Sequence, residues 1–109
     1  MIDESQESHD PFREYLANKK DDDFPPLEAI KLMPPSQAIL ILDDYIKCNP
    51  GDDEALTIRG LKHWSLNHRK EAINDYLTAL KINPNSRAKM ALQLANSVLD
   101  YYNKDLLNP

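Results

Sequence analysis

Residues 69–85 read RKEAINDYLTALKINPN, and residues 35–51, 34 positions earlier, read PSQAILILDDYIKCNPG. Identical or similar residues recur at this offset throughout both segments. The pairs are Ala38/Ala72, Ile39/Ile73, Leu42/Tyr76, Ile46/Leu80, Lys47/Lys81, Cys48/Ile82 and Asn49-Pro50/Asn83-Pro84. Each segment has the length of a helix and ends at a proline, which lacks a backbone N–H and stops a helix. An internal offset of this size, with helical content, is typical of stacked helix-turn-helix units.

The residues between these segments supply the other helix of the unit. We predict a first helix at about 54–66, because Asp52 or Asp53 can accept hydrogen bonds from the unpaired N–H groups of its first turn. Asn67 suits the left-handed position that often follows a helix. A second helix is predicted at about 70–82, where apolar residues recur at spacings of three and four.

Small residues stand where the two helices are expected to cross. Gly60 lies in the middle of the first helix, although glycine costs roughly 1 kcal/mol there, and Ala72 lies on the apolar face of the second helix. We expect both residues to allow close contact between two antiparallel helices.

Residues 53–86 resemble one unit of the tetratricopeptide-repeat (TPR) family. The resemblance is carried by small and aromatic residues in the family's order, namely Arg59-Gly60, Leu66, Ala72-Ile73, Tyr76, Ala79-Leu80 and Asn83-Pro84. Two positions depart from the family's pattern, since His63 replaces an aromatic residue and Asn67 replaces a glycine. The last residues, 101–109, are also similar to the end of some small bacterial TPR proteins.

The resemblance implies an all-α fold, a short right-handed superhelical array of four or five helices in helix-turn-helix (TPR) repeats. The expected TPR domain covers residues 25–109, as a degenerate repeat at 25–50, a full repeat at 53–86 and a C-terminal capping helix at 87–104. Pro25-Pro26 and Pro34-Pro35 leave only 27–33 for the first helix of the degenerate repeat.

Residues 1–24 form an acidic N-terminal arm with eight acidic and three basic residues, a net charge of −5. Residues 1–9 are expected to be disordered. A short helix is predicted at 11–20, with Asp10 as its cap and Pro11 in its first turn. We interpret the arm as a solvated tail.

A side chain from the region before the helix at 36–48 is expected to fold over that helix. Leu40 and Ile41 stand on its outer face, where the later helix has Asn74 and Asp75. Leaving two such side chains in water forfeits roughly 1.5–3 kcal/mol each. The candidates to cover them are Phe12, Tyr15, Leu27 and Ile30.

Composition disfavours several functions. Residues 25–109 carry ten acidic and ten basic residues, so no basic field attracts nucleic acid. No apolar run is long enough to cross a membrane, and no signal peptide is recognisable. Cys48, the single cysteine, cannot form an internal disulfide. We therefore expect a cytoplasmic protein.

Catalytic and metal-binding motifs are not found. The sequence has no GxGxxG, P-loop or HExxH pattern, and its carboxylates are spread along solvated faces. His63 and His68 are five positions apart and are expected on different sides of a helix end, so they do not suggest a metal site with Cys48. We expect no catalytic residues, no metal and no cofactor.

By resemblance, a concave groove formed by the first helices binds an unidentified protein or peptide. The implied groove positions are Thr57, Leu61, Trp64 and Ser65. Trp64 either offers its indole to the ligand or packs against the next helix. The family's cationic clamp for a terminal carboxylate is expected to be absent, because Thr57, Ile58 and Leu61 hold its places.

The helix at 87–104, capped by Ser86, has an apolar arc of about 200°, wider than one neighbouring hairpin can cover. The edge left over is either Met90, Leu94 and Tyr101 or Leu92 and Leu99. An exposed apolar edge invites association, so we predict a homodimer through this helix, as a structural alternative to peptide binding. The intramolecular alternative is that Leu106 and Leu107, or the N-terminal segment, cover this edge.

Overall fold

The structure, a computed structural model, describes residues 10–17 and 23–107, the last seven of them as backbone only. The described residues form six α-helices. These are α2 (Pro11–Ala17), α3 (Leu27–Lys31), α4 (Pro35–Cys48), α5 (Asp53–Ser65), α6 (Arg69–Ile82) and α7 (Ala88–Leu107). The prediction of an all-α fold is confirmed. Four or five helices were expected in residues 25–109, and the described part of this range contains five, α3 to α7; α2 lies in the N-terminal arm, where a short helix was predicted separately.

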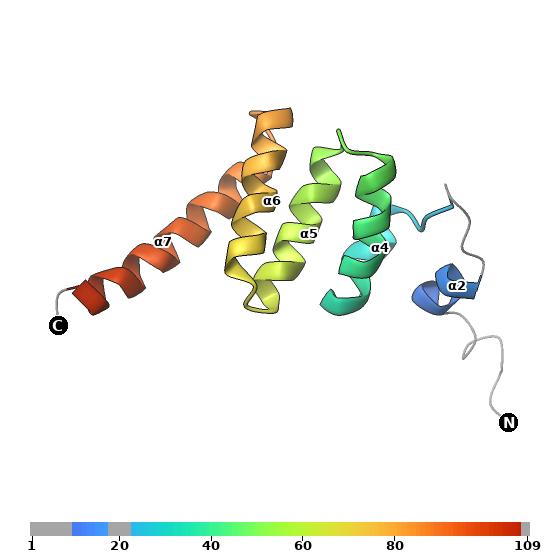
Figure 1. Cartoon of the computed structure of the whole chain (residues 1–109), viewed down its shortest axis with the longest axis horizontal. Helices are drawn as coiled ribbons and strands as arrows, with labels where there is room; N and C mark the ends of the chain where they lie inside the picture. The colour runs from blue at the N-terminus through green and yellow to red at the C-terminus, as the bar shows by residue number, and fades with distance from the viewer. Residues whose placement is uncertain (1–9, 18–22, 108–109) are drawn as a thin grey trace, which may run out of the picture.

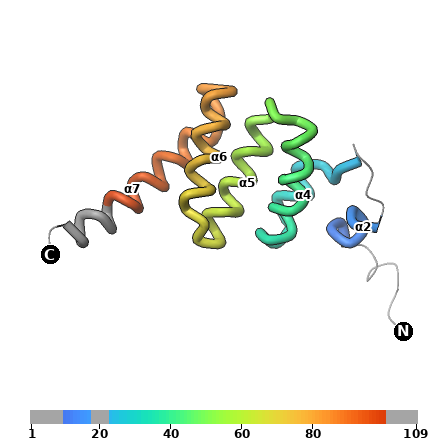
Figure 2. Tube along the Cα trace, viewed as in Figure 1, coloured from blue at the N-terminus to red at the C-terminus, as the bar shows by residue number. Residues whose placement is uncertain are grey.

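Neighbouring helices pack in the order of the chain. α5 packs against both α4 and α6, α6 packs against α7, and α3 packs against α4. Figure 1 shows α4, α5 and α6 side by side, with α7 leading away from them. Figure 2 shows the short connections that reverse the chain between α4, α5 and α6. Each predicted bound of these three helices agrees with the structure within one residue, whereas α7 continues to Leu107.

The predicted helix caps are present. Asp52 accepts the N–H three residues further on at 3.1 Å. Asp10 and Ser86 each accept the N–H two residues further on, at 3.0 and 3.1 Å. Asn67 has a φ of 66°, so it holds the left-handed turn that was predicted. The predictions for residues 1–9 and for the chain between 18 and 22 fall outside the described residues.

Gly60 marks the close crossing of α5 and α6. A Cβ atom on Gly60 would lie 2.5 Å from Cε1 of Tyr76 and 3.2 Å from the carbonyl oxygen of Ala72. Real Cβ atoms are not found this close to a ring, so glycine is required unless the helices separate. The prediction of small residues at the crossing is confirmed, because Ala72 is also fully buried.

Arg59 connects three helices near this crossing. Its Nε and Nη2 donate to the carboxylate of Asp75 on α6 at 2.9 and 2.8 Å, and its Nη1 donates to Asp43 on α4 at 3.0 Å. The hydrogen bond with Asp75 is the main reason why the pKa of Arg59 is raised. The paired charges fix α4, α5 and α6 relative to one another.

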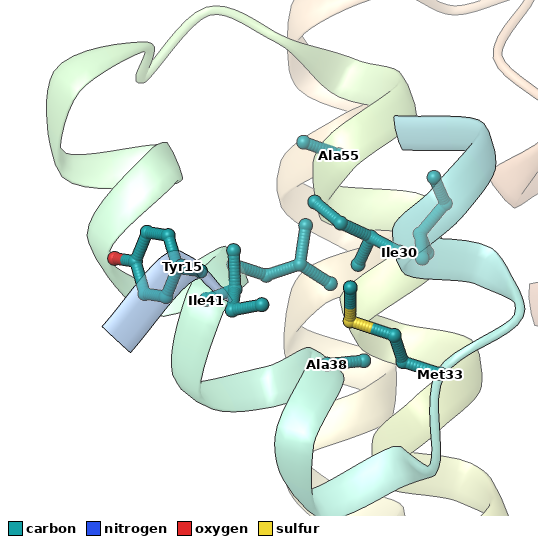
Figure 3. Packing of buried hydrophobic residues seen from close by; sticks show 8 residues of the cluster. Tyr15, Ile30, Met33, Ala38, Ile41 and Ala55 are labelled. Atoms are coloured by element: carbon teal, nitrogen blue, oxygen red, sulfur yellow. The ribbon is translucent and has the colours of Figure 1, made fainter. Parts of the chain in front are cut away.

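The N-terminal helices cover one side of α4. Tyr15, Ile30 and Met33 pack with Ala38 and Ile41 in a buried cluster (Figure 3). The hydroxyl of Tyr15 also donates to Asp44 at 2.9 Å.

The prediction for the outer face of α4 is half right. Ile41 is fully buried, as expected, but Leu40 is 58% exposed. Phe12 and Leu27 are only partly buried, at the margin of the cluster. The cluster covers Ile41, and Leu40, one position earlier on the helix, stays in water.

A second cluster joins α5, α6 and α7. Its buried residues are Leu56, Ala72, Tyr76, Ala79, Ala88 and Ala95. The small side chains of Ala88 and Ala95, which are almost fully buried, let α7 lie close to α6. No helix of the described residues is at once long and apolar enough to cross a membrane.

Candidate protein-binding groove

A groove of about 480 Å³ lies between α5 and the first turns of α7, with Lys31 of α3 at its rim. The α5 residues that line it are spaced by three and four, so they form one face of that helix. They are Glu54, Thr57, Ile58, Leu61, Lys62 and Ser65. α7 contributes Met90, Ala91 and Leu94, and Arg87 lies directly before it in the chain. The groove therefore has one wall from each of two helices that are not consecutive in the chain.

The middle of the groove is apolar and open to solvent. Leu61 is 49% exposed, Met90 is 69% exposed and Leu94 is 65% exposed. Large apolar side chains that lie together and are exposed to this degree mark a surface that can bind another molecule. All three side chains line the groove, so together they offer a ligand an apolar surface.

One end of the groove is charged. The carboxylate of Glu54 lies 3.4 Å from Nζ of Lys31 and 3.7 Å from Nη1 of Arg87. Arg87 is largely exposed, so its pair with Glu54 is open to competition by a ligand. The sequence predicted a groove held by apolar contact, and the structure adds this charged end.

Lys62 serves the fold more than the groove. Its ammonium donates to the carbonyl oxygens of Lys31 and Met33 at 2.7 and 2.8 Å. Lys31 is the last residue of α3 and Met33 follows it by two positions, at a helix end where carbonyls are left without partners. Burial lowers the pKa of Lys62. The bonds hold the end of α3 against α5 and so fix one side of the groove.

The four predicted groove positions do not all face the groove. Leu61 and Ser65 line it, and Thr57 lies in its wall, where it is buried and bonded to Ser86 at 3.2 Å. Trp64 is not a lining residue. It packs against the second cluster, and the guanidinium of Arg69 lies 4.7 Å from its ring centroid. This is the packing alternative that the sequence left open.

The position of Trp64 on α5 explains why this side chain packs against α6 and does not line the groove. Trp64 follows Leu56 and Gly60 at intervals of four, so the three residues share the stripe of α5 that faces α6. The sequence contained this signal, because the contact of Gly60 with the second helix was already predicted from it.

The residues predicted for self-association separate into two groups. Leu92 and Leu99 are half-buried, and Leu92 packs against the second cluster. Met90 and Leu94 are exposed. The side chain of Tyr101 lies outside the described residues. The open edge of α7 is therefore the one that contains Met90 and Leu94, which the sequence did not connect with the groove.

His63 and His68 lie together, and the expectation that they lie on different sides is wrong. Their Nδ1 atoms are 3.2 Å apart. The left-handed Asn67 turns the chain back over the end of α5, which brings the second ring beside the first. Within the described ranges, no three His, Cys, Asp or Glu side chains converge in a way that could hold a metal ion.

No family model, curated protein or solved structure matches this chain.

Proposed function

We propose that the chain is a short TPR-like array with a right-handed superhelical arrangement, and that it acts as a non-catalytic scaffold that binds a segment of another protein. The internal sequence repeat supports the array. α4 and α6 begin at residues 35 and 69 and each has 14 residues. The caps of α5 and α7, Asp52 and Ser86, are separated by the same step.

The observation that carries the proposal is the apolar middle of the groove, made by Leu61, Met90 and Leu94. Covering their exposed parts contributes roughly 3–5 kcal/mol in total. The apolar surface of the ligand adds a similar amount, before the entropy cost of association is subtracted. A dissociation constant of about 1 μM corresponds to roughly 8 kcal/mol, so after this cost is subtracted we expect binding weaker than about 1 μM.

The ligand that fits is a polypeptide with at least one large apolar side chain. Thr57 and Ile58 are buried and carry no charge, so they offer no cation for a terminal carboxylate. The affinity is therefore expected to depend on apolar contact, with the charged end of the groove adding specificity.

A library of displayed random peptides tests this proposal. We expect peptides with apolar anchors to be enriched on the wild-type protein and lost on Leu61→Glu. Leu77→Glu is the matched control, because Leu77 on α6 is 45% exposed but does not line the groove. The proposal fails if no peptide is enriched, or if both variants lose the same peptides.

A further inference from the structure

The charged side chains that line the groove carry an excess of positive charge. Among the described residues, the cations Lys31, Lys62 and Arg87 line it, against the single acid Glu54. The chain as a whole has a net charge of −5, and residues 25–109 carry equal numbers of acidic and basic residues. The excess of cations is therefore local to the groove, and a ligand with negative charge complements it.

Lys31 and Arg87 flank Glu54 without binding it tightly. The carboxylate of Glu54 lies 3.4 Å from Nζ of Lys31 and 3.7 Å from Nη1 of Arg87. Charge-assisted hydrogen bonds are shorter, at about 2.7–2.9 Å, so both cations keep donors for a second carboxylate. Lys31 also contacts the exposed Glu28 at 3.3 Å. The side chain of Arg87 is 78% exposed, and the contact with Glu54 is its one ion pair within the described part of the chain.

Arg87 stands where a cation does not serve the helix. It lies between the cap Ser86 and the first residue of α7, and the first turn of α7 contains no acidic residue. The start of a helix carries a partial positive charge, so a cation is unfavourable there and an anion is favourable. A ligand carboxylate at this place is attracted by Arg87 and by the start of α7 together.

We propose that the groove binds an internal acidic segment of another polypeptide. One Asp or Glu side chain of the segment lies between Lys31 and Arg87, and a large apolar side chain packs against the apolar middle of the groove. This inference rests on the proposed function and specifies its ligand. A side-chain carboxylate is the group expected, because Glu54 already places one between the same two cations.

The two walls of the groove set the spacing within the ligand. Leu61 follows Glu54 by seven positions, and Leu94 follows Arg87 by seven positions. Seven residues of helix span about 10 Å. An extended segment covers that distance in about three residues, so the acidic and the apolar residue of the ligand should be about three positions apart.

A library of random peptides joined to the display protein through their C-terminus tests this inference, because only side chains then provide carboxylates. On the wild type we expect Asp or Glu to be enriched about three positions from an apolar residue. Arg87→Glu should lose the acidic preference and still fold, since an acid is favourable at the start of a helix. Lys89→Glu is the matched control and should keep the preference, because Lys89 is exposed but does not line the groove.

The outcomes separate this inference from the proposed function. Apolar peptides enriched on the wild type without an acidic preference overturn the inference and leave the proposed function in place. The absence of any enriched peptide overturns both. Enrichment of Lys or Arg indicates a basic ligand bound through Glu54 and overturns the inference, as does an acidic preference that survives in Arg87→Glu or is lost equally in Lys89→Glu.

Glu54 provides a second test with a selected acidic peptide. Because Glu54 competes with the ligand for both cations, Glu54→Gln should lower the dissociation constant about two- to fivefold, the range of an exposed ion pair. Titration calorimetry of the full chain measures this change. A dissociation constant that is unchanged or raised in Glu54→Gln overturns the placement of the ligand carboxylate between Lys31 and Arg87.

Discussion

Replacing Gly60 with alanine tests the close crossing of α5 and α6. The added Cβ would lie 2.5 and 2.8 Å from two ring carbons of Tyr76 and 3.2 Å from the carbonyl oxygen of Ala72. Ordinary van der Waals contact begins at 3.4 Å, so the overlap with the ring is close to 1 Å. The ring of Tyr76 is only 1% exposed and has no solvent to move into. α5 and α6 must therefore separate or tilt.

The expected loss of stability follows from two opposing effects. Overpacking of a core costs about 1–3 kcal/mol, and we take the upper part of this range because one of the contacts is with backbone. Alanine recovers roughly 1 kcal/mol through its higher helix propensity. The free energy of unfolding should fall by about 1–2 kcal/mol, which lowers the melting temperature by roughly 4–8 °C for each kcal/mol. Urea unfolding followed by circular dichroism measures this change.

The second glycine provides the matched control. Gly51 lies in an exposed turn where an added Cβ meets nothing within 4 Å, and its φ is not positive. Gly51→Ala should change the stability by no more than about 0.5 kcal/mol, or raise it slightly. In a Tyr76→Leu background, Gly60→Ala should cost less than in the wild type. If Gly60→Ala is as stable as Gly51→Ala, the assigned crossing is incorrect.

Three further changes test single contacts. Burial and the bond to Asp44 raise the pKa of Tyr15 from 10.0 to about 12. The Tyr15 hydroxyl therefore loses its proton at a lower pH in the unfolded chain than in the folded chain. Its contribution to stability is complete below pH 10 and is lost as the pH rises towards 12. The melting temperature of Tyr15→Phe should therefore fall less steeply with rising pH over that range than the melting temperature of the wild type. Equal slopes for the two proteins would contradict this. Arg59→Gln removes the guanidinium from the carboxylate of Asp75, which is 6% exposed. The free energy of unfolding measured in urea should fall by about 2–3 kcal/mol. A fall below about 0.5 kcal/mol would show that the pair is not formed. Lys62→Met leaves two carbonyl oxygens at the end of α3 without their donor and should cost about 1–2 kcal/mol. Hydrogen exchange should then be faster in α3, and an unchanged rate would exclude the contact.

The parts of the fold that depend on local sequence could be predicted. The bounds of α4, α5 and α6 follow from the internal repeat and from the residues that begin and end helices. The cap at Asp52 and the left-handed Asn67 satisfy backbone groups within a few residues, so no distant contact is needed to foresee them. The resemblance implied groove positions for Leu61 and Ser65, and both side chains line the groove of the structure.

The parts that depend on packing between distant segments could not be predicted. The helical pattern gives α7 an apolar arc wider than one neighbour covers, but α5 and α6 decide which edge remains open. Leu40 and Ile41 are adjacent, and only the position of α2 and α3 decides that the second is covered. The contact between His63 and His68 depends on the direction in which the turn at Asn67 returns the chain. Each of these outcomes is set by tertiary contacts that the helical pattern does not contain.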